Sequence, residues 1–592
     1  MNLNNASQIV IILAGGTAAQ LLAWRLQIPS IVFLLLIGIV LGPLMGAVSP
    51  SAIFGDLLTP IVSMSVALIL FEAGTTLHLK ELSGRRGTVV ALITIGALVA
   101  FIGITAACHY LLAVPLQGSL IIGSILVVSG PTVVIPLLHS IRLKEPLGAI
   151  LKWEGILIDP IGVILAILIA EGLVDTAMAA TPLHIFYGML ASLSVGAVLG
   201  VAGGAIIVLA LRRYLVPDHL QLPFLICTVL LSFWASNYFY HESGLLAATL
   251  AGMIVAEKGG VSCRNILDFA ANLQPLLVAF LFVVLSANLD PEHLAIVGWE
   301  SLLFLAALIL IVRPFSVFVS TSLSKLSIRE KVLLSSIAPR GIVAASLASV
   351  LTLNLSKSGI PGVEYVLPVI FFTIIGTVLL YGSIAPILAW TLSLRQANPQ
   401  GVMFVGASSF VRAFAQALAK HGVKVTLIDN NIRNIWKGRK LGLSCHHGNA
   451  LSEHVQDELD LEGIGAMVAL TPNDEANSLS VLEYERILGR ANAYQVAPYE
   501  GESDRYLSPA QGKVLGLRRL TWYQIEELWD NGYRVRTIPM PQEGVSSLDE
   551  NIFPLAALLP EKKVSLLHPE FTTTLKGEIS LVVFAPRPGV GQ

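Results

Sequence analysis

The chain has 592 residues, of which 55% are hydrophobic and only 13% are charged, and its formal net charge is −2. A composition this apolar excludes an ordinary soluble protein. The net charge is close to zero and the sequence has no block of basic residues, so nothing indicates nucleic-acid binding. The four cysteines are too scattered for a disulfide framework or a spaced metal site.

The charged residues divide the chain into two unlike parts. Residues 1–396 hold 35 of the 76 Asp, Glu, Lys and Arg residues, and the much shorter remainder holds the other 41. This contrast predicts a transmembrane domain over 1–396 followed by soluble protein. Within the soluble part we expect a Rossmann-like regulatory domain at 397–532 and a small C-terminal subdomain at 533–592.

Apolar runs recur through the first part, each near the roughly 20 residues that a helix needs to cross a bilayer. Lys and Arg residues gather in alternate connecting segments, which is typical of cytoplasmic loops. This alternation predicts the N-terminus outside and the soluble part in the cytoplasm. We therefore predict a polytopic α-helical membrane protein with about 13 transmembrane helices, at 7–24, 29–46, 57–77, 88–113, 118–138, 150–171, 185–211, 222–240, 243–257, 273–289, 301–323, 331–353 and 365–394.

Two of these runs contain helix-breaking residues. Ser129-Gly130-Pro131-Thr132 interrupts the fifth run, and Pro339-Arg340-Gly341 interrupts the twelfth. Irregular backbone at membrane depth is tolerated where it lines a cavity or is buried in protein. When the two halves of a membrane domain each contain an interrupted helix at the corresponding position, they indicate inverted repeats with an ion site where the interrupted helices cross. The simpler alternative is a pair of proline kinks without a role in binding.

Asp159 is the most informative residue of the membrane part, because it lies in the otherwise apolar sixth run. A carboxylate at membrane depth costs at least ~2.5–3.5 kcal/mol on an insertion scale, so such a residue is a functional candidate. Pro160 withholds a backbone donor beside it. A buried acid next to loosened backbone can bind a cation or a proton, which is the chemistry of an ion-coupled transporter.

Glu154 lies five residues before Asp159, which places the two side chains about 140° apart around a helix. The two acids therefore do not form one paired-carboxylate site. An unpaired arginine inside a span would be costly, so we expect a structural ion pair between Glu154 and Arg340. Arg313, in the eleventh run, is interpreted as structural.

These segments resemble the monovalent cation:proton antiporter superfamily, of the bacterial sodium/proton exchanger type, over residues 7–394. The resemblance is carried by the motifs at Glu154–Asp159, Phe71–Gly74 and Pro339–Val343. It implies that Asp159 binds cation and proton alternately. It also implies a homodimer in the inner (plasma) membrane of a bacterium.

The chain departs from the family's pattern where Gly155, Ile158 and Gly130 replace a serine, an asparagine and an aspartate. Each change removes a polar group, so the choice between Na⁺ and K⁺ stays open. With a single titrating acid we predict electroneutral exchange of one cation for one proton. Glu72 is equally consistent with an outer ligand and with a capped residue near the interface. The expected cation- and proton-binding residues are Asp159, Glu72, Ser129 and Thr132.

The soluble part begins with a strand predicted at 401–405, a turn at Gly406, a helix to about Lys420 and a strand at 423–428 that ends at Asp429. This order, with an acid 23 residues after the glycine, is typical of a nucleotide-binding Rossmann unit. The glycine motif is degraded, since Ser408 stands in place of the second glycine.

Residues 399–520 also resemble the regulatory domains that gate potassium channels and potassium efflux systems. The resemblance implies a regulatory nucleotide, NAD(H) or an adenine nucleotide, with Gly406, Ser408 and Asp429 as its binding residues. The alternative is a Rossmann module that serves dimerisation alone. No required cofactor and no metal are expected.

The leading hypothesis is a secondary antiporter, and not an enzyme, that exchanges Na⁺ or K⁺ for H⁺ and is regulated by its soluble domain. The alternative is a potassium channel or uptake subunit with the same kind of domain. Potassium channels use carbonyl-lined filters of the Thr-Val-Gly-Tyr-Gly type, and the sequence contains no such segment. A tethered enzyme would not need thirteen spans.

Overall fold

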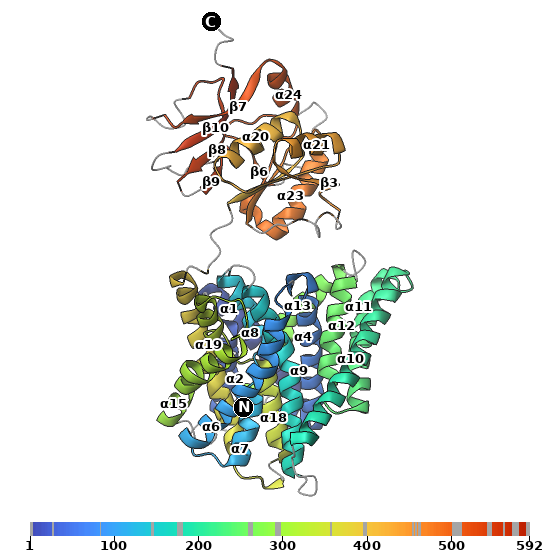
Figure 1. The fold of residues 1–592 in the computed structure, drawn as a ribbon. Coiled ribbons are helices and arrows are strands. Elements are labelled where there is room, and N and C mark those ends of the chain that lie inside the picture. The colour runs from blue at the N-terminus through green and yellow to red at the C-terminus, as the bar shows by residue number, and fades with distance from the viewer. Residues whose placement is uncertain are drawn as a thin grey trace. The chain divides into compact units, whose positions relative to one another are not determined.

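The computed structural model divides into two compact units, Met1–Arg395 and Gln396–Gln592, which Figure 1 shows as a helical part and an α/β part. The following account concerns the residues that the structure describes. They are 4–26, 29–82, 84–141, 143, 147–174, 182–258, 264–289, 298–355, 358–392, 394, 400–452, 455, 459, 463–499, 512–541, 548–560, 563–570 and 579–587.

The first unit is a bundle of apolar helices. By length and composition, nine helices of its described residues could cross a membrane, and shorter apolar helices accompany them. The elements are α1 (Asn5–Leu26), α2 (Ser30–Ile39), η1 (Val40–Leu44), α3 (Pro50–Phe54), η2 (Gly55–Leu57), α4 (Leu58–Thr75), η3 (Leu79–Leu82), α5 (Arg86–Ala91), η4 (Leu92–Gly96), α6 (Ala97–Leu111), α7 (Leu116–Ile125), α8 (Pro131–Ile141), α9 (Leu147–Val174), α10 (Pro182–Arg212), α11 (Asp218–Phe239), α12 (Gly244–Lys258), α13 (Arg264–Ala287), α15 (Trp299–Ala307), η6 (Leu308–Val312), α16 (Arg313–Ser320), α17 (Ile328–Ser335), α18 (Ile342–Leu355), η8 (Val363–Tyr365) and α19 (Val366–Thr391).

Every predicted apolar run overlaps one of these helices or a consecutive set of them. The polytopic helical class is thereby confirmed, while the number of thirteen crossings stays a prediction. Both expected interruptions are present: α7 and α8 are separated by 126–130, and α17 and α18 by 336–341.

The two interrupted segments meet each other in the bundle. The Gly130 amide donates a hydrogen bond to the Pro339 carbonyl at 3.2 Å. A Cβ added to Gly130 would lie 2.4 Å from the Gly341 Cα atom, and one added to Gly341 would lie 2.4 Å from the Gly130 Cα atom. Glycine at both positions therefore permits backbone-to-backbone contact between the two breaks.

The second unit contains a six-stranded parallel sheet in the order β3-β2-β1-β4-β5-β6, which is the Rossmann order. Its first two strands pair in parallel, with Val402 opposite Val425 and Val405 opposite Ile428. The predicted first strand is confirmed, and the second begins two residues later than expected. The elements are β1 (Gly401–Val405), α20 (Ser409–Lys420), β2 (Val425–Asp429), α21 (Ile432–Lys440), β3 (Ser444–His447), β4 (Ile464–Ala469), α23 (Asp474–Leu488), η9 (Arg490–Asn492), β5 (Ala493–Gln495) and β6 (Lys513–Val514).

A second, antiparallel sheet follows in the order β7-β10-β8-β9. It shares a hydrophobic core with the Rossmann part, since Phe410 of α20 contacts Phe584 with ring centroids 5.0 Å apart. The predicted division at 532/533 therefore falls between two sheets of one packed unit. The elements are α24 (Trp522–Asp530), β7 (Tyr533–Pro539), β8 (Phe553–Leu559), β9 (Lys563–Leu566) and β10 (Ser580–Pro586).

Candidate ion site and nucleotide pocket

Asp159 lies inside α9 and is fully buried. Neither carboxylate oxygen has a hydrogen-bond partner among the described residues. Pro160 follows within the same helix, so the Ile156 carbonyl loses its usual helical donor. Buried polar groups almost always have partners, so this unpartnered carboxylate makes Asp159 a candidate site for a ligand or a proton.

Two other predicted site residues share this property. Glu72 of α4 is buried with its Oε2 atom unpartnered, and Thr132 of α8 is buried with its Oγ1 atom unpartnered. Ser129 is buried at the end of the first break. All four predicted ligands are therefore buried, and three of them have oxygens without a partner in the described part of the chain.

A small cavity of about 20 Å³ lies beside the breaks and has room for roughly one water molecule. It brings Ser129 together with Glu154, Ile158, Arg313 and Arg340. The other three predicted ligands are not among the described residues that line it. The structure thus places Ser129 against the arginines.

The ion pair predicted between Glu154 and Arg340 is wrong. Glu154 instead accepts two hydrogen bonds from Arg313 of α16, at 2.6 Å from Nη1 and 3.0 Å from Nη2. Both side chains are almost excluded from solvent. The sequence offered two buried arginines, and the structure shows that Arg313, the first residue of α16, is the one that reaches the acid.

Arg340 finds its partners in the opposite break. Its Nη1 atom donates to the carbonyls of Val127 and Val128, at 3.1 and 2.9 Å. These carbonyls follow the end of α7, where the helix dipole concentrates negative charge. Thr377 of α19, which the sequence did not indicate, accepts a hydrogen bond from the Arg340 amide at 3.2 Å.

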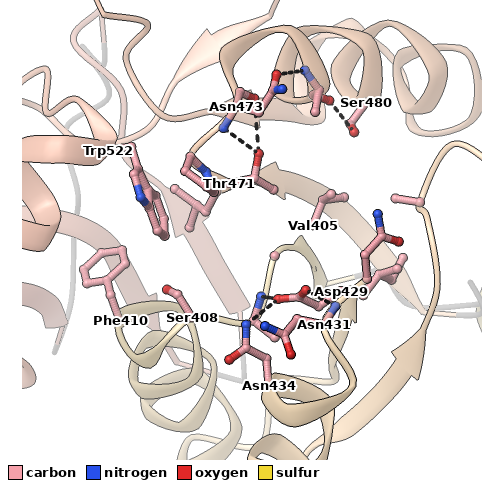
Figure 2. Close-up of a pocket in the computed structure, with 18 of the residues that line it drawn as sticks. Val405, Ser408, Phe410, Asp429, Asn431, Asn434, Thr471, Asn473, Ser480 and Trp522 are labelled. Atoms are coloured by element: carbon pink, nitrogen blue, oxygen red, sulfur yellow. Dashed lines mark hydrogen bonds between the residues drawn. The ribbon is translucent and has the colours of Figure 1, made fainter.

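A cavity of about 850 Å³ in the second unit lies at the carboxyl ends of the parallel strands. All three predicted nucleotide-binding residues line it (Figure 2). Gly406 has φ +104°, and a Cβ there would lie 2.3 Å from the Leu470 carbonyl oxygen. This glycine is therefore required by the backbone itself. Ser408 caps α20, with its hydroxyl accepting from the Val411 amide at 3.3 Å.

Asp429 at the end of β2 is held by three donors. Its Oδ2 atom accepts from the Ala407 amide at 2.7 Å and from Asn434 Nδ2 at 3.1 Å, and its Oδ1 atom accepts from the Asn431 amide at 2.7 Å. The carboxylate is thus fixed, with lone-pair capacity left for a ligand hydroxyl. Burial lowers the pKa of the nearby Arg412, against the opposing charge of Asp429.

The far wall of this pocket was not predicted from the sequence. It is formed by α24, which contributes Trp522, Ile525, Glu526, Trp529 and Asp530. An amphipathic helix of nine residues some hundred positions after the glycine turn carries no local signal of this role. Only the packing of the second sheet against α20 brings it over the strand ends.

The fold and these sites define a polytopic membrane protein with a Rossmann-like soluble domain, and the comparisons agree. The transmembrane sodium/hydrogen exchanger family matches residues 9–391, and the TrkA-N domain matches 402–506. The chain therefore belongs to the sodium/hydrogen exchanger family.

Its relatives and a solved structure each match about two thirds of this chain. The chain is 24% identical over 418 residues to the probable Na(+)/H(+) antiporter 2 of Methanocaldococcus jannaschii, covering 66% of this chain and 97% of that protein. It is 26% identical over 399 residues to the K(+)/H(+) antiporter NhaP2 of Shewanella baltica, covering 65% and 66%. The structure of the sodium proton antiporter MjNhaP1 from Methanocaldococcus jannaschii aligns with a TM-score of 0.58 at 23% identity, covering 66% of this chain and 98% of that one.

Proposed function

We propose that the protein exchanges a monovalent cation, Na⁺ or K⁺, for H⁺ across a membrane, with Asp159 as the carrier of both. The observation that carries the proposal is a fully buried carboxylate with two unpartnered oxygens, in a chain of the exchanger family. An isolated buried carboxylate is too costly to persist. It is occupied either by a cation or by a proton, and this exclusivity couples the two fluxes.

We propose Glu72, Thr132 and Ser129 as further cation ligands on the strength of their buried oxygens. Glu72 and Thr132 each offer a buried oxygen that needs a partner, and Ser129 adds a hydroxyl beside the break. Relatives are named both as Na⁺/H⁺ and as K⁺/H⁺ antiporters, so both ions remain substrates to be tested. A potassium channel is not favoured, since none of these relatives is named as one.

The stoichiometry follows from the number of carriers. One carboxylate exchanges one positive charge for another, so the cycle is electroneutral. We further propose that the protein is a homodimer of a bacterial inner membrane with its N-terminus outside. The soluble unit lies in the cytoplasm and regulates transport through a bound nucleotide.

The test is proton flux in proteoliposomes with an internal pH dye and an imposed pH gradient. We expect Na⁺ or K⁺ to collapse the gradient with wild type and not with Asp159→Asn. Glu171→Gln is the matched control, because Glu171 is an exposed acid on the same helix. Equal flux in wild type and Asp159→Asn would refute the mechanism.

Electroneutrality is tested in the same vesicles. A membrane potential set by a gradient of a permeant anion, with potassium absent, should leave the sodium-driven rate unchanged. A rate that follows the imposed voltage would show that the exchanged charges are unequal.

A further inference from the structure

Helix α21 of the soluble unit presents apolar side chains to solvent. One side of the helix packs on β2 and β3 and buries Ile435 and Gly438. On its outer side Ile432 and Trp436 are 45% and 62% exposed, and Leu441, directly after the helix, is 46% exposed. Ile432 and Trp436 are neighbours one helical turn apart. Neighbouring large apolar side chains left in solvent indicate a surface that another body covers.

The charges on the same helix are all positive. Residues 430–452 contain four Lys or Arg residues and no Asp or Glu. Arg439 donates to a backbone carbonyl, at 3.2 Å from Nε and 3.0 Å from Nη2. The other three, Arg433, Lys437 and Lys440, are exposed and form no ion pair among the residues that the structure describes. They fall within about 60° of one another around the helix, beside Trp436.

We call this surface the α21 face. It consists of Ile432, Arg433, Trp436, Lys437, Lys440 and Leu441. A stripe of free basic groups runs along it next to aromatic and aliphatic side chains, so a partner that fits it has to be both negatively charged and partly apolar.

A second helix of the same unit shows that exposed apolar side chains alone do not select such a partner. Leu479 and Leu482 of α23 are 53% and 45% exposed. The helix, Asp474–Leu488, carries four acids and one arginine, so negative charge would be repelled from its surface. Of these two helices, α21 is the one whose charge suits an anionic partner.

An anionic lipid surface matches the α21 face in charge and in polarity. Tryptophan is enriched at membrane interfaces, where its ring lies at the level of the headgroups. Each Lys or Arg near anionic headgroups is worth about 1 kcal/mol. The nine residues 392–400 join α19 to β1, and a chain of that length spans at most about 32 Å. A bilayer that holds the first unit is therefore within reach of the soluble unit.

We propose that the α21 face docks on the anionic phospholipid surface of the membrane that holds the first unit. Ile432 and Trp436 enter the headgroup region, and Arg433, Lys437 and Lys440 lie against lipid phosphates. The proposal goes beyond ion exchange, since it requires only that the first unit spans a bilayer. Docking makes the placement of the soluble unit depend on the charge of the lipid and on salt.

The experiment determines where Trp436 lies, using the full-length protein in nanodiscs of phosphatidylcholine, with or without phosphatidylglycerol. Lipids brominated on their acyl chains quench a tryptophan that enters the bilayer, and acrylamide quenches one that stays in water. The difference between wild type and Trp436→Phe isolates the fluorescence of this residue. We expect quenching by the lipid only where phosphatidylglycerol is present. High salt should abolish this quenching, because it screens the charges.

A charge variant tests the basic stripe. Lys437→Gln with Lys440→Gln should weaken docking by roughly fivefold for each lost charge, measured as quenching by the lipid against the fraction of phosphatidylglycerol. Lys563→Gln with Arg587→Gln is the matched control, because it removes the same charge from two exposed residues outside the α21 face. The control should dock as wild type does.

Three results would overturn the proposal. The first is full quenching of Trp436 by acrylamide in both kinds of nanodisc. The second is protection of Trp436 from both quenchers, which would indicate a protein partner such as a second copy of this chain. The third is equal docking by the two double variants. Asp159→Asn should dock as wild type does, so a failure of the exchange mechanism leaves this test intact.

Discussion

Removing the acid of the buried Glu154–Arg313 pair should destabilise the membrane unit strongly. The pair is bidentate, with N–O distances of 2.6 and 3.0 Å, and the two side chains are 5% and 11% exposed. Taking one partner from a buried pair typically costs about 3–5 kcal/mol, because the other charge is left uncompensated. We therefore expect Glu154→Gln to lower the free energy of unfolding by about 3–5 kcal/mol.

The two single variants should differ in a way that follows from their chemistry. Arg313 cannot release its proton in a protein, so Glu154→Gln leaves a permanent buried cation. Glu154 can take up a proton when its partner is removed, so Arg313→Gln should cost less and should cost least at low pH. Neutralising both Glu154 and Arg313 should restore most of the unfolding free energy that Glu154→Gln loses. We expect a coupling energy between the two residues of about 2–3 kcal/mol.

The assay is a double-mutant cycle on unfolding free energies, measured by denaturant titration in mixed micelles. A second cycle pairs Glu154→Gln with Arg340→Gln, since Arg340 bonds to the carbonyls of Val127 and Val128 instead. We expect a smaller coupling energy in that cycle than in the first, because Glu154 and Arg340 line one cavity but share no hydrogen bond, whereas Glu154 and Arg313 form two. Equal coupling in the two cycles, or larger coupling to Arg340, would refute the assignment of the partners.

Two further outcomes are expected. Gly130→Ala should lower the free energy of unfolding by about 1–3 kcal/mol through overpacking, because the added Cβ would lie 2.4 Å from the Gly341 Cα atom. Gly87→Ala is the control, since a Cβ there meets open space, and it should leave the stability unchanged. Thermal unfolding measures both. Burial, and then Lys513, lower the pKa of His568, so the neutral ring stabilises the fold above about pH 6.5 and this contribution is lost as pH falls. The protection of amides at 563–568 against hydrogen exchange, corrected for the intrinsic pH dependence of exchange, should therefore fall between about pH 7.5 and 5.5 in wild type. The fall should be smaller in His568→Gln, and an equal fall in both would exclude this residue as the cause.

Much of the fold could be predicted from the sequence because the bilayer imposes strong rules. A helix that crosses lipid needs a long apolar run, and backbone irregularity at that depth needs a special reason. The interruptions at Gly130-Pro131 and Pro339-Arg340-Gly341 were visible on these grounds. Strand, turn and helix at 401–420 were equally clear, since glycine at Gly406 marks the turn.

The partners of the buried charges could not be predicted in the same way. Arg313 and Arg340 were both arginines inside apolar runs, and either could have neutralised Glu154. The choice depends on the rotation and depth of α16 and α17–α18 against α9, which no local pattern encodes. The role of α24 is hidden for a similar reason, because its place over the pocket depends on the docking of a second sheet.

The contact between the two breaks also explains one departure of this chain from its family's pattern. The family's pattern has an aspartate where this chain has Gly130, and the Gly130 and Gly341 backbones are too close for a side chain there. The carbonyls of Val127 and Val128 are instead balanced by Arg340, which comes from the other break. Backbone contact and the Arg340 guanidinium thus occupy the crossing of the two breaks, where the family's pattern has an acidic side chain.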